Sequence, residues 1–117
     1  MADNEFLEAL NSTVEVELTV KGRRSSRNTT RPVWFVLEGA TLYLLPMYGF
    51  KTEWYQILLA NPEIMLSAKG KKMTAHAKPI QEGAKVAEVV SRFRSKHGAD
   101  EIKKYYIKLE AAVAVPI

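Results

Sequence analysis

The segment Val14–Val20 alternates strictly between apolar and polar side chains, and this pattern limits how the chain can fold more than any other. Successive side chains of a β-strand point to opposite faces, so a period of two predicts a strand with its valines and Leu18 facing a core. Apolar runs at Pro32–Leu37 and Leu42–Met47 flank the turn residues Glu38-Gly39-Ala40, which predicts a β-hairpin. The first half of the chain is therefore expected to be rich in β-structure.

Helical and strand patterns alternate along the rest of the chain. Apolar residues at helical spacing predict helices at 6–10, 53–60 and 83–97, the last ended by Gly98. Strands are expected at 64–68, 73–80 and 105–116, with a turn at 69–72. Six strands in a chain of 117 residues predict one mainly β domain of the α+β class over residues 1–117, an antiparallel sheet curled into a small six-stranded barrel with flanking helices.

Composition excludes several classes of function. The chain has no cysteine and only two histidines, which excludes disulfides and thiolate chemistry and argues against a metal site. No apolar run approaches the roughly 20 residues that span a bilayer, so no membrane association is expected. The acidic start Met1–Glu5 lacks the apolar core of a signal peptide, and a cytoplasmic location is expected.

Positive charge is concentrated in two short segments. Residues 21–31 carry five cations and no acid, and residues 69–78 carry four lysines and no acid, out of 17 Lys and Arg in the chain. Arginine forks with neighbouring hydroxyls and loop amides are suited to holding phosphate or carboxylate groups. The first segment is thus a candidate anion site, and the alternative is a solvated basic hairpin loop. The lysines of the second flank a tight turn and are interpreted as solvated surface.

Several motifs in one order resemble the deazaflavin-dependent nitroreductase family. They are Gly22-Arg23-Arg24-Ser25, Arg31-Pro32-Val33, Glu38-Gly39, and Trp54-Tyr55-x-x-Leu58-x-Ala60-Asn61-Pro62. That family belongs to the split β-barrel flavin-binding group typified by pyridoxamine 5'-phosphate oxidase. The resemblance covers about Val14 to Ile80, more than half of the chain.

The resemblance implies a homodimeric split β-barrel that binds coenzyme F-420, a deazaflavin, or FMN. It implies an oxidoreductase that transfers a hydride from the reduced cofactor to a small organic acceptor, as a nitroreductase does. The residues that correspond to the cofactor-binding positions of the family are Arg23, Arg24, Ser25, Pro32, Val33, Met47, Trp54 and Tyr55. No catalytic side chain is assigned, because the cofactor carries the redox chemistry.

The chain departs from the family pattern at three positions. Ser26 stands where the family has glycine, and Thr29 where it often has arginine, for which Arg27 or Arg31 can compensate. Tyr48 replaces a family lysine, and Lys51 is the nearest cation to take its place. These departures weaken the case for F-420 and leave FMN, or a loss of activity, open.

Several residues have structural alternatives to a functional role. Trp34, in a continuous apolar run, is interpreted as core, and Trp54 and Tyr55 as packing anchors of their helix. Of Tyr105 and Tyr106 at the start of the last expected strand, one should point outward and could donate a proton.

A non-catalytic barrel that binds flavin or single-stranded nucleic acid is the alternative function. The aromatic residues lie in apolar runs and do not alternate with cations, so nucleic acid is the less expected ligand.

Overall fold

The computed structural model describes residues 4–22 and 28–117. Within these ranges the helices are α1 (Asn4–Asn11), the 3-10 helix η1 (Gly49–Lys51), α2 (Glu53–Ala60), α3 (Gly83–His97) and α4 (Ala99–Tyr105). The strands are β1 (Glu15–Lys21), β2 (Asn28–Trp34), β3 (Val36–Glu38), β4 (Thr41–Leu44), β5 (Glu63–Ala68), β6 (Lys71–His76), β7 (Lys78–Ile80) and β8 (Ala112–Pro116). None of the described helices is both long enough and apolar enough to cross a bilayer.

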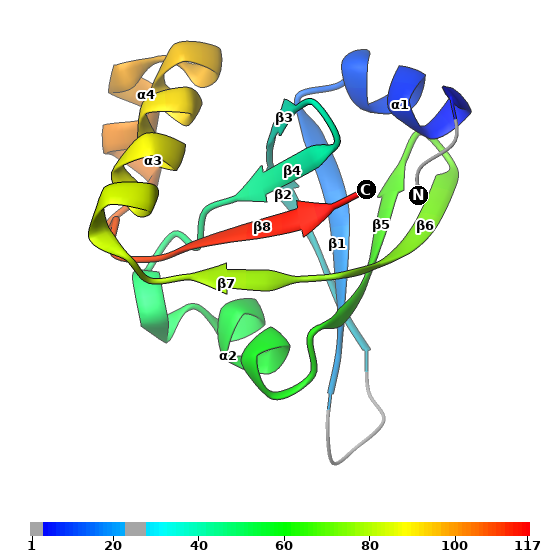
Figure 1. The fold of residues 1–117 in the computed structure, drawn as a ribbon, viewed down its shortest axis with the longest axis horizontal. Helices are drawn as coiled ribbons and strands as arrows, with labels where there is room; N and C mark the ends of the chain where they lie inside the picture. Colours follow the sequence, from blue (N-terminus) through cyan, green and yellow to red (C-terminus); the bar gives the residue numbers. More distant parts are fainter. Residues whose placement is uncertain (1–3, 23–27) are drawn as a thin grey trace.

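The strands form two antiparallel sheets, each of four strands (Figure 1). One has the order β2-β1-β5-β6 and the other the order β3-β4-β8-β7. The expected α+β class agrees with this arrangement. The expected single barrel of six strands does not, since the described residues contain eight strands in two sheets.

Two of the expected strands are each divided between the sheets. The run from Pro32 to Leu37 breaks at Phe35, where β2 of one sheet ends and β3 of the other begins. The run from Met73 to Ile80 breaks in the same way at Ala77, whose backbone N–H leaves the ladder and donates to Pro62 O at 2.8 Å. Each break lies within continuously extended chain, and this explains why the sequence pattern predicts one strand in place of two.

The strand expected over 105–116 is wrong for its first half. Residues Ala99–Tyr105 form α4, and the strand β8 begins only at Ala112. Asp100 and Glu101 in the first turn of α4 and lysines in its last turn complement the helix dipole. Gly98, at φ 96°, ends α3 and starts α4, so the chain turns sharply between two helices.

Two hydrophobic cores hold the fold together. The larger lies between the two sheets and includes the inward side chains of β1, with α1 and α2 packed against it. Val16, Leu18 and Val20 are each no more than 1% exposed, as their alternation predicts, whereas Val14 precedes the strand and is 59% exposed. The smaller core joins α3 and α4 to Val36, Leu45 and Ala112. The second core fixes the end of α4 beside β2 and the segment that follows β4.

Candidate functional site

A cavity of about 620 Å³ lies between β2, the segment that runs from β4 into α2, and the end of α4. Its walls come from residues 31–34, 45–48, 51–54 and 105–106, with Glu15 at the start of β1. Ligand pockets for small molecules and cofactors typically measure about 300–1,000 Å³. The cavity is therefore large enough for a cofactor-sized molecule.

Six of the predicted cofactor-binding residues line this cavity. They are Arg31, Pro32, Val33, Met47, Lys51 and Trp54. Tyr55 does not line it: its side chain is 0% exposed in the main core, and its hydroxyl accepts a hydrogen bond from Gln81 Nε2 at 3.2 Å. The alternative interpretation of Tyr55 as a packing anchor agrees with this position.

The predicted residues Arg23, Arg24 and Ser25 lie outside the described part of the chain. The strand that follows them begins at Asn28, four residues earlier than its apolar run predicts. Lys21 of β1 pairs with Asn28 of β2, so the connection between these strands is shorter than the basic stretch itself.

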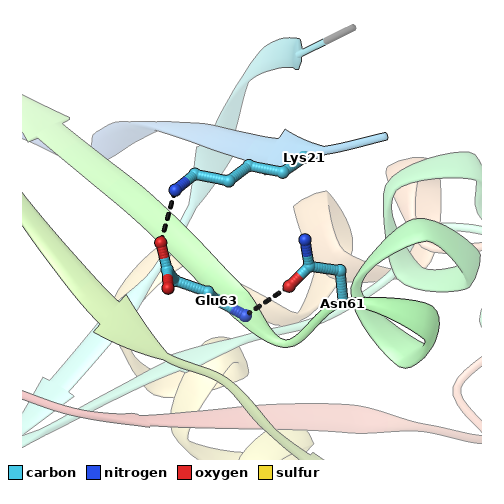
Figure 2. Close-up of polar contacts among 3 residues, drawn as sticks. All are labelled: Lys21, Asn61 and Glu63. Carbon is cyan, nitrogen blue, oxygen red and sulfur yellow. Dashed lines mark hydrogen bonds and ion pairs between the residues drawn. The ribbon is translucent and has the colours of Figure 1, made fainter. Parts of the chain in front are cut away.

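Lys21, the first cation of the basic stretch, is engaged in an ion pair with Glu63 of β5 (Figure 2). Asn61 Oδ1 accepts a hydrogen bond from the Glu63 backbone N–H at 3.3 Å and so helps to fix the start of β5. The hydrogen bond and charge of Lys21 lower the pKa of the Glu63 carboxyl below its ordinary value of 4.5. Lys21 thus joins neighbouring strands, and its charge is matched by a partner within the sheet.

The cations at the cavity differ in their partners. Arg31 Nη2 lies 3.3 Å from Glu53 Oε1, in the first turn of α2, and both side chains are more than half exposed. Lys51, at the end of η1, makes no ion pair with any described residue. An anion that enters the cavity would meet Lys51 directly but would compete with Glu53 for Arg31.

Because β2 is an edge strand, residues from both of its faces reach the cavity. Arg31 and Val33 stand opposite Leu18 and Val16 of β1 and so share their face, whereas Trp34 stands opposite Glu15 on the other face. Trp34 is half-buried, lines the cavity and stacks on His97 at a centroid distance of 4.6 Å. Trp34 also packs against the smaller core, so its interpretation as a core residue describes only part of its position.

Tyr105 and Tyr106 line the cavity from the end of α4. Tyr105 is 40% exposed and Tyr106 is 7% exposed, as expected for one outward and one inward tyrosine, although they lie at the end of a helix and not in a strand. Burial raises the pKa of the Tyr106 phenol well above its ordinary value of 10.0. No described residue forms a hydrogen bond with the Tyr106 hydroxyl, which is thus a neutral donor free to serve a ligand.

The loop between β4 and α2 is held in place from two sides. Met47 O accepts hydrogen bonds from Ile107 N and Lys108 N at 2.8 and 3.2 Å, and Glu110 Oε2 accepts one from Phe50 N at 3.0 Å. Thr52 precedes α2 as expected, but its Oγ1 accepts from Tyr48 N at 2.9 Å and does not cap the helix. These contacts place Met47 and Lys51 at the cavity. The sequence gives no sign that residues 107–110 support this loop.

The cavity combines apolar and aromatic walls with cations at its border. Indoles of Trp34 and Trp54 and the phenols of Tyr105 and Tyr106 offer flat surfaces for a planar ring, which the ring quadrupole favours in stacked or edge contacts. No group of three or more His, Asp or Glu side chains in the described ranges is placed to hold a metal ion. The donor set therefore suits an organic ring that carries a negatively charged tail.

A family model matches residues 6–115, nearly the whole chain, and its description is "Uncharacterized protein conserved in bacteria (DUF2255)". The chain belongs to the DUF2255 family. No curated protein matches the sequence.

Solved structures similar to this DUF2255 chain include two enzymes and a heme storage protein, by their titles. A reductase described as dependent on F420-H2 has 17% identity and a TM-score of 0.66, with 87% of this chain and 93% of that chain covered. A putative pyridoxamine 5'-phosphate oxidase from Listeria innocua has 13% identity and a TM-score of 0.67, with 97% and 90% covered. The heme storage protein HutZ from Vibrio cholerae has 12% identity and a TM-score of 0.73, with 97% and 88% covered.

At these identities the similarities show the fold alone. The DUF2255 chain shares the fold of these structures, one of which is titled a putative pyridoxamine 5'-phosphate oxidase, and this agrees with the resemblance of its sequence motifs.

Proposed function

We propose that the cavity beside β2 binds a flavin-like cofactor, FMN or the deazaflavin coenzyme F-420, and that the protein is an oxidoreductase. When bound, such a ring supplies the two-electron hydride chemistry that reduces a small organic acceptor of the nitro type. The observation that carries the proposal is one cavity of about 620 Å³ that brings together aromatic walls, Arg31 and Lys51. The F420-H2 dependent reductase among the structures of the same fold supports it.

Each wall has a distinct part in holding the cofactor. Pro32, Val33 and Met47 provide an apolar surface against the ring, and Trp54, which is 6% exposed, supports that surface from the first turn of α2. Burying these apolar groups against a ring is favourable by roughly 25 cal/mol per Å². Arg31 and Lys51 bind the phosphate, and in the same proposal Arg23, Arg24 and Ser25 extend this anion site along the chain.

Tyr106 supplies a hydrogen bond to the acceptor. Its hydroxyl is neutral because burial raises its pKa, so it is available as a donor across the physiological pH range. A donor fixed before the substrate arrives stabilises charge that develops on an acceptor oxygen without reorganisation cost. Tyr105, the more exposed phenol, or a water molecule supplies the proton that balances the hydride.

The active form in this proposal is a homodimer. Five of the exposed large apolar side chains, Met47, Tyr48, Phe50, Tyr105 and Ile107, belong to the cavity border or to the segments hydrogen-bonded to it. Apolar groups gathered in this way are typical of an interface, and a second copy related by a two-fold axis would cover them. Sedimentation at several concentrations would reveal the dimer, and Ile107→Glu should dissociate it.

The alternative function is a protein that binds a flavin-like cofactor without turnover. The similarity in fold to a protein titled as a heme storage protein favours this second candidate. Turnover separates the two: the oxidoreductase oxidises its reduced cofactor faster when a nitro acceptor or a tetrazolium dye is added, and the storage protein does not.

Titration with FMN and with F-420, followed by cofactor fluorescence, tests the proposal. Wild type and Lys72→Ala should bind with equal affinity, because Lys72 is an exposed residue of β6 outside the cavity. Lys51→Ala should weaken binding about tenfold, the loss expected for one charge-assisted hydrogen bond to phosphate. Absence of binding for both cofactors would refute the proposal. Steep, salt-dependent binding of single-stranded RNA in their place would identify a nucleic-acid-binding module.

A further inference from the structure

The last turn of α3 packs directly against a wall of the cavity. The imidazole of His97 stacks on the indole of Trp34, with ring centroids 4.6 Å apart and planes inclined by 9°. Trp34 belongs to the cavity lining, but His97 does not. His97 is therefore placed to influence the cavity through Trp34 without touching what the cavity holds.

His97 has contacts besides Trp34 that hold its imidazole in place. His97 Nε2 lies 3.1 Å from Phe35 O, and Lys96 Nζ donates to the same oxygen at 2.9 Å. This carbonyl is available because Phe35 lies at the break between β2 and β3. The Phe93 ring contacts the imidazole at a centroid distance of 5.6 Å.

Trp34 depends on packing for its orientation. No described residue forms a hydrogen bond with its indole nitrogen. Its other ring contacts are the edge of Tyr105 at 5.6 Å and the tilted ring of Tyr106 at 6.2 Å, both of which also line the cavity. Of these ring contacts, the one with His97 has the shortest centroid distance and the only near-parallel planes.

We propose that His97 is a positioning residue that holds Trp34 flat as a wall of the cavity and thereby sets the affinity of the site for a planar ring. The inference rests on the proposed function for the identity of that ring. The contact between His97 and Trp34 is independent of it.

His97 also makes this wall sensitive to acid. Burial lowers the pKa of His97 below its ordinary value of 6.5, and the Lys96 ammonium lowers it further, while the hydrogen bond to Phe35 O raises it. Across Trp34 lie the phenols of Tyr105 and Tyr106, and Glu15 stands opposite Trp34 on β1. At neutral pH the ring is therefore neutral, and in acid an imidazolium forms against the indole.

Fluorescence of Trp34 tests the contact without any ligand. The chain has two tryptophans, so Trp54→Phe leaves Trp34 as the sole source of tryptophan emission. An imidazolium in contact with an indole quenches its emission by accepting an electron. Emission should fall between pH 8 and pH 5 with one midpoint below 6.5, and the fall should vanish in Trp54→Phe/His97→Ala. The matched control is Trp54→Phe/His76→Ala, because His76 is the other histidine of the chain and lies on β6.

The effect of His97 on the site is tested by FMN binding to proteins that retain Trp54. His97→Ala should raise the Kd about fivefold, the factor expected for loss of one aromatic contact. His97→Phe keeps a stacked ring and should restore the affinity, whereas His97→Gln keeps only the polar contact and should not. Melting curves for each variant establish that it is folded.

Two results would overturn the inference: an acid-induced fall in emission that persists without His97, or a folded His97→Ala protein that binds FMN as tightly as wild type. If wild type binds neither FMN nor F-420, the proposed function fails. The emission experiment alone then decides whether His97 fixes Trp34.

Discussion

Gly49 is the position where one added methyl group should disturb the site most. It is buried, and its φ of 60° lies in the left-handed region that residues with a Cβ rarely adopt. A Cβ at this position would lie 2.6 Å from Cγ and 2.7 Å from Cδ of Glu110. Gly49→Ala therefore combines backbone strain with a steric conflict that forces the Glu110 carboxylate to move.

The magnitude follows from these two effects. The left-handed conformation costs a non-glycine residue about 1–2 kcal/mol. Displacing Glu110 removes the 3.0 Å hydrogen bond from Phe50 N to its carboxylate, which costs about 1 kcal/mol. Gly49→Ala should lower the free energy of unfolding by about 2–3 kcal/mol, which for 117 residues corresponds to a fall in Tm of roughly 8–12 °C.

Chemical denaturation of a double-mutant cycle measures the two effects separately. In the Glu110→Ala background the steric conflict is absent, so Gly49→Ala should cost only the backbone strain, about 1 kcal/mol less than in wild type. Gly39→Ala is the matched control, because Gly39 has φ 59° and no atom within 4 Å of the added Cβ. Gly39→Ala should lower the free energy of unfolding through backbone strain alone, without a steric conflict.

Equal costs of Gly49→Ala in both backgrounds would refute the role assigned to Glu110. A cost below about 0.5 kcal/mol in wild type would refute the left-handed backbone itself. Because Met47 and Lys51 lie on the same loop, the variant should also weaken FMN binding, whereas Gly39→Ala should leave it unchanged.

Three further variants test the ion pairs of Arg31 and Lys21 and the phenol of Tyr106. Glu53→Gln removes the competitor of Arg31 and should tighten FMN binding about twofold at low salt, with a smaller gain at high salt, as measured by fluorescence titration. Glu63→Gln should lower the Tm slightly at pH 7, because Lys21 lowers the pKa of Glu63 and the ionised carboxylate stabilises the fold. That difference should close as the pH falls below 4.5 through the lowered pKa, where wild type also becomes protonated. Tyr106→Phe should reduce turnover about tenfold with little change in the Kd for FMN, as for loss of one hydrogen bond that acts on the acceptor.

The spacing of apolar residues correctly predicts α3 and β1. The helix α3 was expected over 83–97 and is found at Gly83–His97, since Val86, Val89, Val90 and Phe93 recur with the helical period. The alternation of β1 predicts its buried face correctly for the same reason. A period of 2 in a strand, or of 3.6 residues in a helix, shows which side of the element faces the core, so the buried face can be predicted from the sequence.

The breaks between the sheets depend on distant partners and leave no such record. At Phe35 the chain changes sheets while its carbonyl bonds to Lys96 and His97, more than 60 residues away in the sequence. The sequence also does not show that β2 is an edge strand, and for that reason its polar residues 28–31 are predicted to be loop. A continuous apolar run such as 32–37 also fails to show which face of each residue is buried, so it does not reveal that Trp34 lines the cavity while it packs against the smaller core.

The described charges restrict how the basic stretch can act on a ligand. Lys21 at its start and Arg31 at its end each have a carboxylate partner, Glu63 and Glu53, so neither offers an uncompensated charge. The Glu63 carboxylate holds two strands together, and an anion gains little by displacing it. Glu53 stands at the cavity with both members of its pair exposed, where such pairs contribute at most about 1 kcal/mol. An incoming phosphate can therefore take Arg31 from Glu53 at small cost. Of the described cations at the cavity, Lys51 is then the one whose charge no described carboxylate offsets, so in the proposed function it contributes most to selectivity for an anionic tail.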